Sequence, residues 1–128
     1  MTQLFANNAK GKLNANLTNT ATTLTLVTGN GAKFPAITGA DYFLATLFEY
    51  GADGEQNHEI VRVSARSGDT FTIVRAQEGT TARAWGSGTP VELRVTRDTL
   101  NDFHTDGENA DFNAVTASSL ILKETRLT

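Results

Sequence analysis

The sequence predicts an all-β fold, a small antiparallel β-sandwich or barrel-like domain, because its dominant hydrophobic period is two rather than 3.6. Four segments alternate apolar and polar residues, namely 23–27, 59–65, 70–74 and 91–95. Residues two apart share one face of a strand, so each segment offers an apolar row to a core and a polar row to solvent. Threonine, valine, isoleucine and phenylalanine suit that half-buried surface. The expected inward residues are Leu24, Leu26, Val61, Val63, Phe71, Ile73, Leu93 and Val95.

Residues 42–50 (YFLATLFEY) are apolar on both faces. A short helix would give the same run, but the flanking Gly39 and Gly51 and the aromatic content favour a strand. A strand of this kind is covered on both sides. We therefore expect it in the centre of the sheet, with cover by another subunit as the alternative.

The remaining elements are a hairpin, a long loop and one short helix. Residues 66–69 (RSGD) join two alternating segments and predict a hairpin turn. Residues 77–90 form a glycine-rich connection that carries Trp85. At Thr96 the period changes, which predicts a short helix near residues 96–104 with Thr96 as its N-cap.

These elements place a β domain at residues 15–105, between an N-terminal docking arm at 1–14 and a C-terminal tail at 106–128. The two extended tails contain the apolar residues Leu4, Phe5, Phe112, Leu120 and Leu122. Exposed apolar tails normally need a partner surface. Packing of the tails on their own core is the alternative.

Composition excludes several classes of function. The chain has no cysteine, so disulfides, zinc–thiolate sites and cysteine nucleophiles are ruled out. A net charge of −3 argues against nucleic-acid binding, which calls for a basic face. No apolar run is long enough to predict a membrane-spanning helix.

Catalytic and metal-binding patterns are weak. His58 and His104 are the only side chains that titrate near neutrality, and no serine lies in a G-x-S-x-G motif. Residues 53–57 and 106–111 gather oxygen ligands, but without the spacing of a calcium-binding EF-hand, and we expect polar turns there. We therefore expect no enzyme activity, no cofactor and no metal.

Two further interpretations concern aromatic and charged side chains. Trp85 with Tyr50 is a candidate sugar-binding platform, and the alternative is that Trp85 plugs the open end of its own domain. Arginines such as Arg75 are interleaved with glutamates such as Glu59. We expect them to pair across strands on a solvated face.

A series of short motifs resembles one known family. In chain order they are LFANNA (4–9), GNG (29–31), FP (34–35), YF (42–43), EIVRV (59–63), SGDT (67–70), VRAQEGTTA (74–82), Trp85 and Gly88. Together they resemble the small β-structured domain at the N-termini of tail-fibre and related virion proteins of tailed bacteriophages, over about residues 4–100. The R-x-Q-E-G-T-x-A stretch carries most of the resemblance, and it departs from the expected pattern at Ala76, where glycine is expected.

The resemblance implies a structural protein of the virion, assembled in the cytoplasm of the bacterial host, that attaches or links fibre components through contacts with other tail proteins. Residues 112–120 resemble the start of a trimeric shaft, which implies a homo-oligomer, a trimer or higher symmetric ring, without nucleic-acid or membrane partners. A capsid decoration or head-fibre protein and a host-glycan-binding module are the alternatives. The candidate partner-binding residues are Leu4, Phe5, Asn7, Asn8, Trp85, Phe112, Val115, Leu120 and Leu122.

Overall fold

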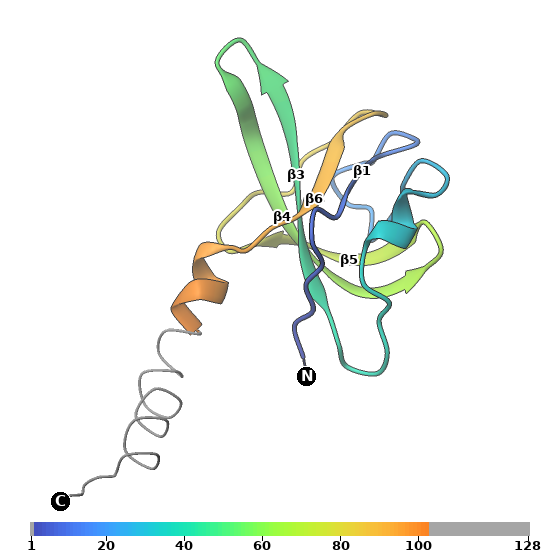
Figure 1. Ribbon diagram of the computed structural model, residues 1–128. Helices are drawn as coiled ribbons and strands as arrows, with labels where there is room; N and C mark the ends of the chain where they lie inside the picture. The colour runs from blue at the N-terminus through green and yellow to red at the C-terminus, as the bar shows by residue number, and fades with distance from the viewer. Residues whose placement is uncertain (1, 103–128) are drawn as a thin grey trace, which may run out of the picture. The chain divides into compact units, whose positions relative to one another are not determined.

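The computed structural model describes residues 2–102, and the chain divides into two units after Arg94 (Figure 1). The first unit holds one antiparallel sheet of six strands in the order β1-β6-β3-β4-β5-β2. The strands are β1 (Lys10–Lys12), β2 (Thr23–Thr25), β3 (Phe43–Gly51), β4 (Gly54–Ser67), β5 (Thr70–Gln77) and β6 (Pro90–Leu93), and a 3-10 turn η1 (Asn30–Lys33) follows β2. The sheet curls into a half-barrel, which confirms the all-β prediction in its barrel-like form.

The two edges of the curled sheet meet just beyond β1 and β2. Leu13 pairs with Leu26 in an antiparallel bridge. The Asn14 N–H donates to the Thr25 carbonyl at 3.0 Å, and the Val27 N–H donates to the Lys12 carbonyl at 2.9 Å. Both edge strands therefore have backbone partners on their outer sides, as in a closing barrel.

Strand β3 lies in the middle of the sheet, between β6 and β4, as its two-faced apolar pattern predicts. Its residues from Phe43 to Phe48 are all buried. One face of the strand faces the core, and on the other the Arg94 guanidinium lies 4.4 Å from the centre of the Phe48 ring. Both faces are thus covered within a single chain.

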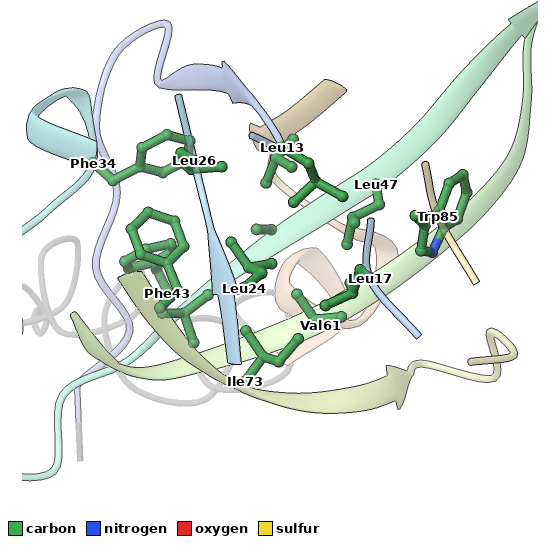
Figure 2. Packing of buried hydrophobic residues seen from close by; sticks show 14 of the residues in the cluster. Leu13, Leu17, Leu24, Leu26, Phe34, Phe43, Leu47, Val61, Ile73 and Trp85 are labelled. Atoms are coloured by element: carbon green, nitrogen blue, oxygen red, sulfur yellow. The ribbon is translucent and has the colours of Figure 1, made fainter. Parts of the chain in front are cut away.

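The core fills the concave side of the sheet (Figure 2). The rings of Phe34, Phe43 and Phe71 pack with centroid distances of 5.1–5.7 Å, and Trp85 lies at the other end of the cluster from Phe34. Of the expected inward residues, Leu24, Leu26, Val61, Val63, Phe71 and Ile73 are buried, and Leu93 packs partly buried against the cluster. The apolar row of each alternating segment thus builds the core.

Val95 is an exception, and its expected burial is wrong. Strand β6 ends at Leu93, so Val95 lies beyond the last ladder residue and is 57% exposed. The helix predicted after it is present over residues 97–102 of the described chain. Its N-cap is Thr96 as expected, because the Thr99 N–H lies 3.4 Å from Thr96 Oγ1 and the Leu100 N–H donates to the Thr96 carbonyl at 3.1 Å.

The expected domain boundaries also need correction. Residues 1–14 do not form a separate arm, because Lys10–Lys12 are strand β1 and both Ala9 and Leu13 are buried in the core. The first unit ends at Arg94 rather than at residue 105. The predicted tail at 106–128 lies outside the described residues.

Candidate functional site

The GNG and SGDT motifs, about forty residues apart in the chain, meet in space. The Asp69 carboxylate in the β4–β5 turn accepts hydrogen bonds from the backbone N–H groups of Gly31 at 2.7 Å and Gly29 at 3.2 Å. A Cβ atom at Gly31 would lie 2.2 Å from the Gly68 carbonyl oxygen, so only glycine fits. We refer to Gly29, Gly31, Gly68 and Asp69 as the glycine joint, which fixes η1 against the β4–β5 turn.

A second joint surrounds Glu59, whose side chain is fully buried. Oε1 accepts hydrogen bonds from the indole Nε1–H of Trp85 at 2.9 Å and from the backbone N–H of Arg83 at 3.1 Å. Oε2 accepts from Arg75 Nε at 2.8 Å and from the Ala76 N–H at 3.2 Å, and a second Arg75 nitrogen reaches Oε1 at 2.9 Å. We call this group of four residues with Glu59 the carboxylate joint.

Arg75 extends the carboxylate joint to the loop that precedes β2. Its terminal nitrogens donate to the carbonyls of Thr18 at 2.6 Å, Ala21 at 3.1 Å and Arg83 at 2.7 Å. Burial alone would raise the pKa of Glu59, but the hydrogen bonds from Arg75, Trp85 and the two backbone amides outweigh it and hold that pKa below its ordinary value. The expected pairing on a solvated face is therefore wrong for Glu59 and Arg75, because the pair is buried.

The R-x-Q-E-G-T stretch after Arg75 also serves the fold. Ala76, Glu78 and Gly79 all have positive φ, so the backbone here turns sharply. Thr80 holds the turn because its Oγ1 donates to the Gln77 carbonyl at 2.7 Å and accepts from the Ile60 N–H at 3.0 Å. The φ of 56° at Ala76 explains why glycine is expected at that position.

Trp85 is 3% exposed, so the expectation that it offers a sugar platform or a partner contact is wrong. Its backbone pairs with Leu17 through two hydrogen bonds of 2.8 Å, and the Arg83 guanidinium lies 4.7 Å from its ring centre. The alternative, in which Trp85 plugs the end of its own domain, is confirmed. The polar group of the Trp85 side chain, its indole N–H, is bonded to Glu59 in the carboxylate joint.

The N-terminal candidate residues alternate between the core and the surface. The Leu4 N–H donates to the Tyr42 carbonyl at 2.7 Å, and the Leu4 side chain packs partly buried against the core. Phe5 is 50% exposed, and Asn7 and Asn8 are exposed. The fold thus uses Leu4 and leaves Phe5, Asn7 and Asn8 available to a partner.

The β3–β4 hairpin reaches beyond the rest of the sheet (Figure 1). Strand β6 pairs with β3 only over Ala45–Leu47, and β5 pairs with β4 only from Ile60 onward. The ladder from Glu49 and Gln56 to the turn therefore has no third strand beside it. Tyr50 on this hairpin is 68% exposed. The hairpin is a prominent exposed feature that the sequence pattern does not distinguish from an ordinary strand pair.

Side-chain pairs brace the hairpin. Arg94 donates to both carboxylate oxygens of Glu55, at 2.9 and 2.8 Å, and to Glu92 at 2.9 Å. The hydrogen bond from Arg94, helped by His58, lowers the pKa of Glu55 to about 2. These pairs are partly exposed, in agreement with the expected pairing of charges on a solvated face.

Other candidate chemistry is sparse in the described part of the chain. His58 lies 3.1 Å from Glu55 and stacks on Phe48, whereas His104 lies outside the described residues. Residues 2–102 hold no group of three or more His, Asp or Glu side chains placed to bind a metal. No described helix is long and apolar enough to cross a membrane. The candidate contacts Phe112, Val115, Leu120 and Leu122 lie beyond residue 102, outside the described part.

No protein-family model matches the chain, and a search of curated proteins finds no match either.

Proposed function

We propose that the chain is a structural protein of a tailed-bacteriophage virion, of tail-fibre or tail-adaptor type, which attaches or links fibre components through protein–protein contacts. One observation carries the proposal. The motifs behind the resemblance, GNG with SGDT and EIVRV with R-x-Q-E-G-T, form the glycine joint and the carboxylate joint. Because these motifs contact one another and stabilise the fold, their resemblance to the family favours a shared fold over a chance similarity of short sequence motifs.

The proposal assigns partner binding to the surface that these joints leave free. Phe5 offers an apolar contact next to the amide side chains of Asn7 and Asn8, all on one short segment. Aromatic side chains are enriched at protein interfaces, and the neighbouring amides can donate and accept hydrogen bonds. Contacts between subunits through Phe112, Val115, Leu120 and Leu122 complete the proposal of a homo-oligomer.

The proposed role is not enzymatic. The buried carboxylate, Glu59, is the polar group whose environment is most unusual, and it accepts five hydrogen bonds. A carboxylate so fully engaged stabilises the fold and has no lone pair directed to a substrate. The buried charge of Glu59 is therefore explained by its part in stabilising the fold.

Location in the phage particle tests the proposal. The proteins of one sample of purified particles are digested and their peptides are identified by mass spectrometry. A second, intact sample is imaged by cryo-electron microscopy. We expect peptides of this chain in the particle and density for the half-barrel at the tail. Density at capsid vertices would instead favour the capsid decoration or head-fibre alternative, and absence from the particle contradicts both.

Substitution of the surface residues tests the assigned contacts. We expect Phe5→Ala combined with Asn7→Ala and Asn8→Ala to reduce incorporation of fibres into particles without lowering the unfolding midpoint by more than a few degrees. Val27→Ala, at an apolar residue that is 43% exposed elsewhere on the domain, is the matched control. Equal incorporation in both variants would show that these residues do not dock the fibre.

A further inference from the structure

A cleft of about 350 Å³ is lined by residues of strand β1, the turn η1 and the β3–β4 hairpin. Lys10 and Lys12 line it from β1, Lys33 from η1 and Tyr50 from the hairpin, and all four residues are exposed. The sequence has one other lysine, Lys123. We refer to this site as the lysine cleft. Its volume is that of a pocket for a small organic ligand.

The lysine cleft carries an excess of positive charge. Within residues 2–102 none of its three lysines forms an ion pair with a carboxylate, although four of the arginines do. Glu92 is the one carboxylate in the lining, and it already accepts hydrogen bonds from two nitrogens of Arg94, at 3.1 and 2.9 Å. Arg94 therefore offsets the charge of Glu92, and the cleft stays positive on a chain whose net charge is −3. A concave site of this kind attracts anions.

The fold fixes the backbone that carries the lysines. Gly11 separates the two lysines of β1, and a Cβ atom there would lie 2.8 Å from Asn30 Cβ, so the glycine lets η1 pack closely on β1. The Lys12 N–H donates to Asn30 Oδ1 at 3.0 Å, and the glycine joint ties η1 to the β4–β5 turn through Asp69. The backbone of Lys33 is thus held next to β1 before a ligand binds, which lowers the cost of binding.

The polar groups of the lysine cleft are mainly hydrogen-bond donors. Each ammonium group has three donors and no acceptor. Asn30 also lines the cleft, and because its Oδ1 accepts the Lys12 N–H, its Nδ2 group presents two further donors. A phosphate monoester has three acceptor oxygens and a charge of about −1.5 to −2 at pH 7. A carboxylate has two oxygens and a single charge, so the lining suits a phosphate better.

Tyr50 and Pro90 supply the apolar part of the lining. The Tyr50 ring is 68% exposed and packs edge-on against Phe48, with 5.4 Å between the ring centres. Such a ring is amphipathic, so its face can cover the C–H groups of a ligand while its hydroxyl stays in water. A ligand that fits both parts of the cleft has a phosphate at one end and a hydrated ring at the other, which is the form of a sugar phosphate.

We infer that the lysine cleft binds a sugar phosphate, with its phosphate monoester among the ammonium groups of Lys10, Lys12 and Lys33 and its sugar ring against Tyr50. The ligand is a free sugar phosphate or a phosphorylated unit of a polysaccharide, and both have the chemistry that the cleft recognises. The inference goes beyond the proposed role in a virion and does not depend on it, because the isolated full chain is enough for the test.

Titration of the full chain with glucose 6-phosphate tests the inference, with calorimetry and amide NMR shifts as the measurements. We expect saturable binding with the largest shifts at Gly11, Lys12, Asn30 and Lys33. Binding should weaken at high salt, because the Debye length falls from about 10 Å at 0.1 M to about 3 Å at 1 M. Glucose, which lacks the phosphate, should not bind. Absence of saturable binding, or shifts confined to another part of the domain, would overturn the inference.

Charge changes in the lining should move the affinity in opposite directions. Lys10→Gln, Lys12→Gln and Lys33→Gln should each weaken binding by about twofold to fivefold, as is usual for exposed charge pairs. Glu92→Gln should strengthen binding, because it removes the carboxylate from the lining. Lys123→Gln, at the remaining lysine, is the matched control and should leave the affinity unchanged. Equal losses in all four lysine variants, when their circular dichroism matches the wild type, would show that total charge rather than the cleft attracts the ligand.

Tyr50 distinguishes a sugar phosphate from a bare phosphate. The wild-type chain should bind inorganic phosphate more weakly than glucose 6-phosphate. Tyr50→Ala should weaken binding of glucose 6-phosphate severalfold and leave binding of inorganic phosphate unchanged, whereas Tyr50→Phe keeps the ring and should bind both as the wild type does. Equal wild-type affinities for the two ligands, or equal losses for both in Tyr50→Ala, would overturn the assignment of the sugar ring.

A polymer distinguishes the two sources of the ligand. Displacement of glucose 6-phosphate by dextran that carries phosphate monoesters would indicate a polysaccharide, and failure to displace it would indicate a free sugar phosphate. Both results support the cleft as a sugar-phosphate site. Dextran sulfate that displaces glucose 6-phosphate equally well at the same charge density would overturn the assignment in favour of a general polyanion site.

Discussion

Glu59 and Trp85 are joined by a hydrogen bond of 2.9 Å from the indole Nε1–H to the carboxylate Oε1 in the buried interior. The bond connects strand β4 with the long loop before β6, and Arg75 adds strand β5 to the same carboxylate. One side chain thus ties the β4–β5 ladder to the loop that carries Trp85, and the stability of the domain should depend strongly on the charge of that side chain.

Replacing Glu59 by glutamine should destabilise the domain by about 3–5 kcal/mol, because Arg75 is left as a buried charge without its partner. Equilibrium unfolding in urea gives this free energy. Glu92→Gln, which removes a partly exposed partner of Arg94, is the matched control and should cost less than about 1 kcal/mol. Similar losses in the two variants would show that the Glu59–Arg75 pair is effectively solvated.

The same carboxylate should make the domain sensitive to acid. The pKa of Glu59 is lowered in the folded state, so its contribution to stability is full above the ordinary value of 4.5 and is lost as the pH falls through the lower folded value. We expect the free energy of unfolding to decline with pH below about 4.5, and to decline less steeply in Glu59→Gln. Parallel curves for the two proteins would assign the acid sensitivity to other groups.

The pKa of Glu55 reports whether the Arg94–Glu55 pair of the β3–β4 hairpin persists in solution. Carbon-detected NMR should give Glu55 a pKa of about 2, and Arg94→Gln should raise that pKa towards 4.5 because the largest cause of the shift is removed. His58→Ala should raise it by less, since the His58 hydrogen bond is the smaller cause. A Glu55 pKa near 4.5 in the wild-type protein would mean that the Arg94–Glu55 pair does not persist in solution.

The departure from the family pattern at Ala76 predicts a stabilising substitution. Ala76 has a φ of 56°, a region in which a Cβ atom is strained by about 1 kcal/mol, so Ala76→Gly should raise the free energy of unfolding by up to that amount. Ala65→Gly, at an exposed position inside strand β4, should lower it by about 0.5–1 kcal/mol. The opposite signs separate relief of strain from the general cost of glycine.

The glycine joint predicts that Gly31 cannot carry a side chain. Gly31→Ala would place Cβ 2.2 Å from the Gly68 carbonyl oxygen, and the forced shift should cost about 1–3 kcal/mol. Gly86→Ala is the control, because the nearest atom to a Cβ there is Asn16 Oδ1 at 3.9 Å. Thermal unfolding should distinguish the two, with a lower midpoint for the first variant only.

Period-two alternation predicted the part of the core that the long strands supply, because Val61, Val63, Phe71 and Ile73 face inward as the pattern predicts. The same pattern also contained a signal for the carboxylate joint. Glu59 has the parity of Val61 and Val63, so its position alone places a carboxylate on the inward row. A buried carboxylate requires a partner, so the sequence position of Glu59 predicts a buried ion pair, and the structure identifies Arg75 as its partner.

Other features depend on contacts that no local pattern contains. The pairing of Leu17 with Trp85 joins two loops distant in sequence, and the end of β6 at Leu93 depends on which strands lie beside it. The gathering of Lys10, Lys12 and Lys33 likewise follows from how η1 packs on β1. The candidate binding surfaces, strand β1 and the core residues supplied by loops therefore required the fold, whereas the alternating strands and their inward rows did not.

The place of β6 between β1 and β3 has a consequence for how the protein folds during synthesis. Strand β1 leaves the ribosome before the other strands of the sheet, yet its ladder partner, Pro90–Glu92, is the last of them to emerge. Until that segment emerges, β1 has no ladder partner and the sheet cannot close. We expect the nascent chain to complete folding late and on the slow timescale of non-local β proteins, so any chaperone that assists it should act before residue 90 is exposed.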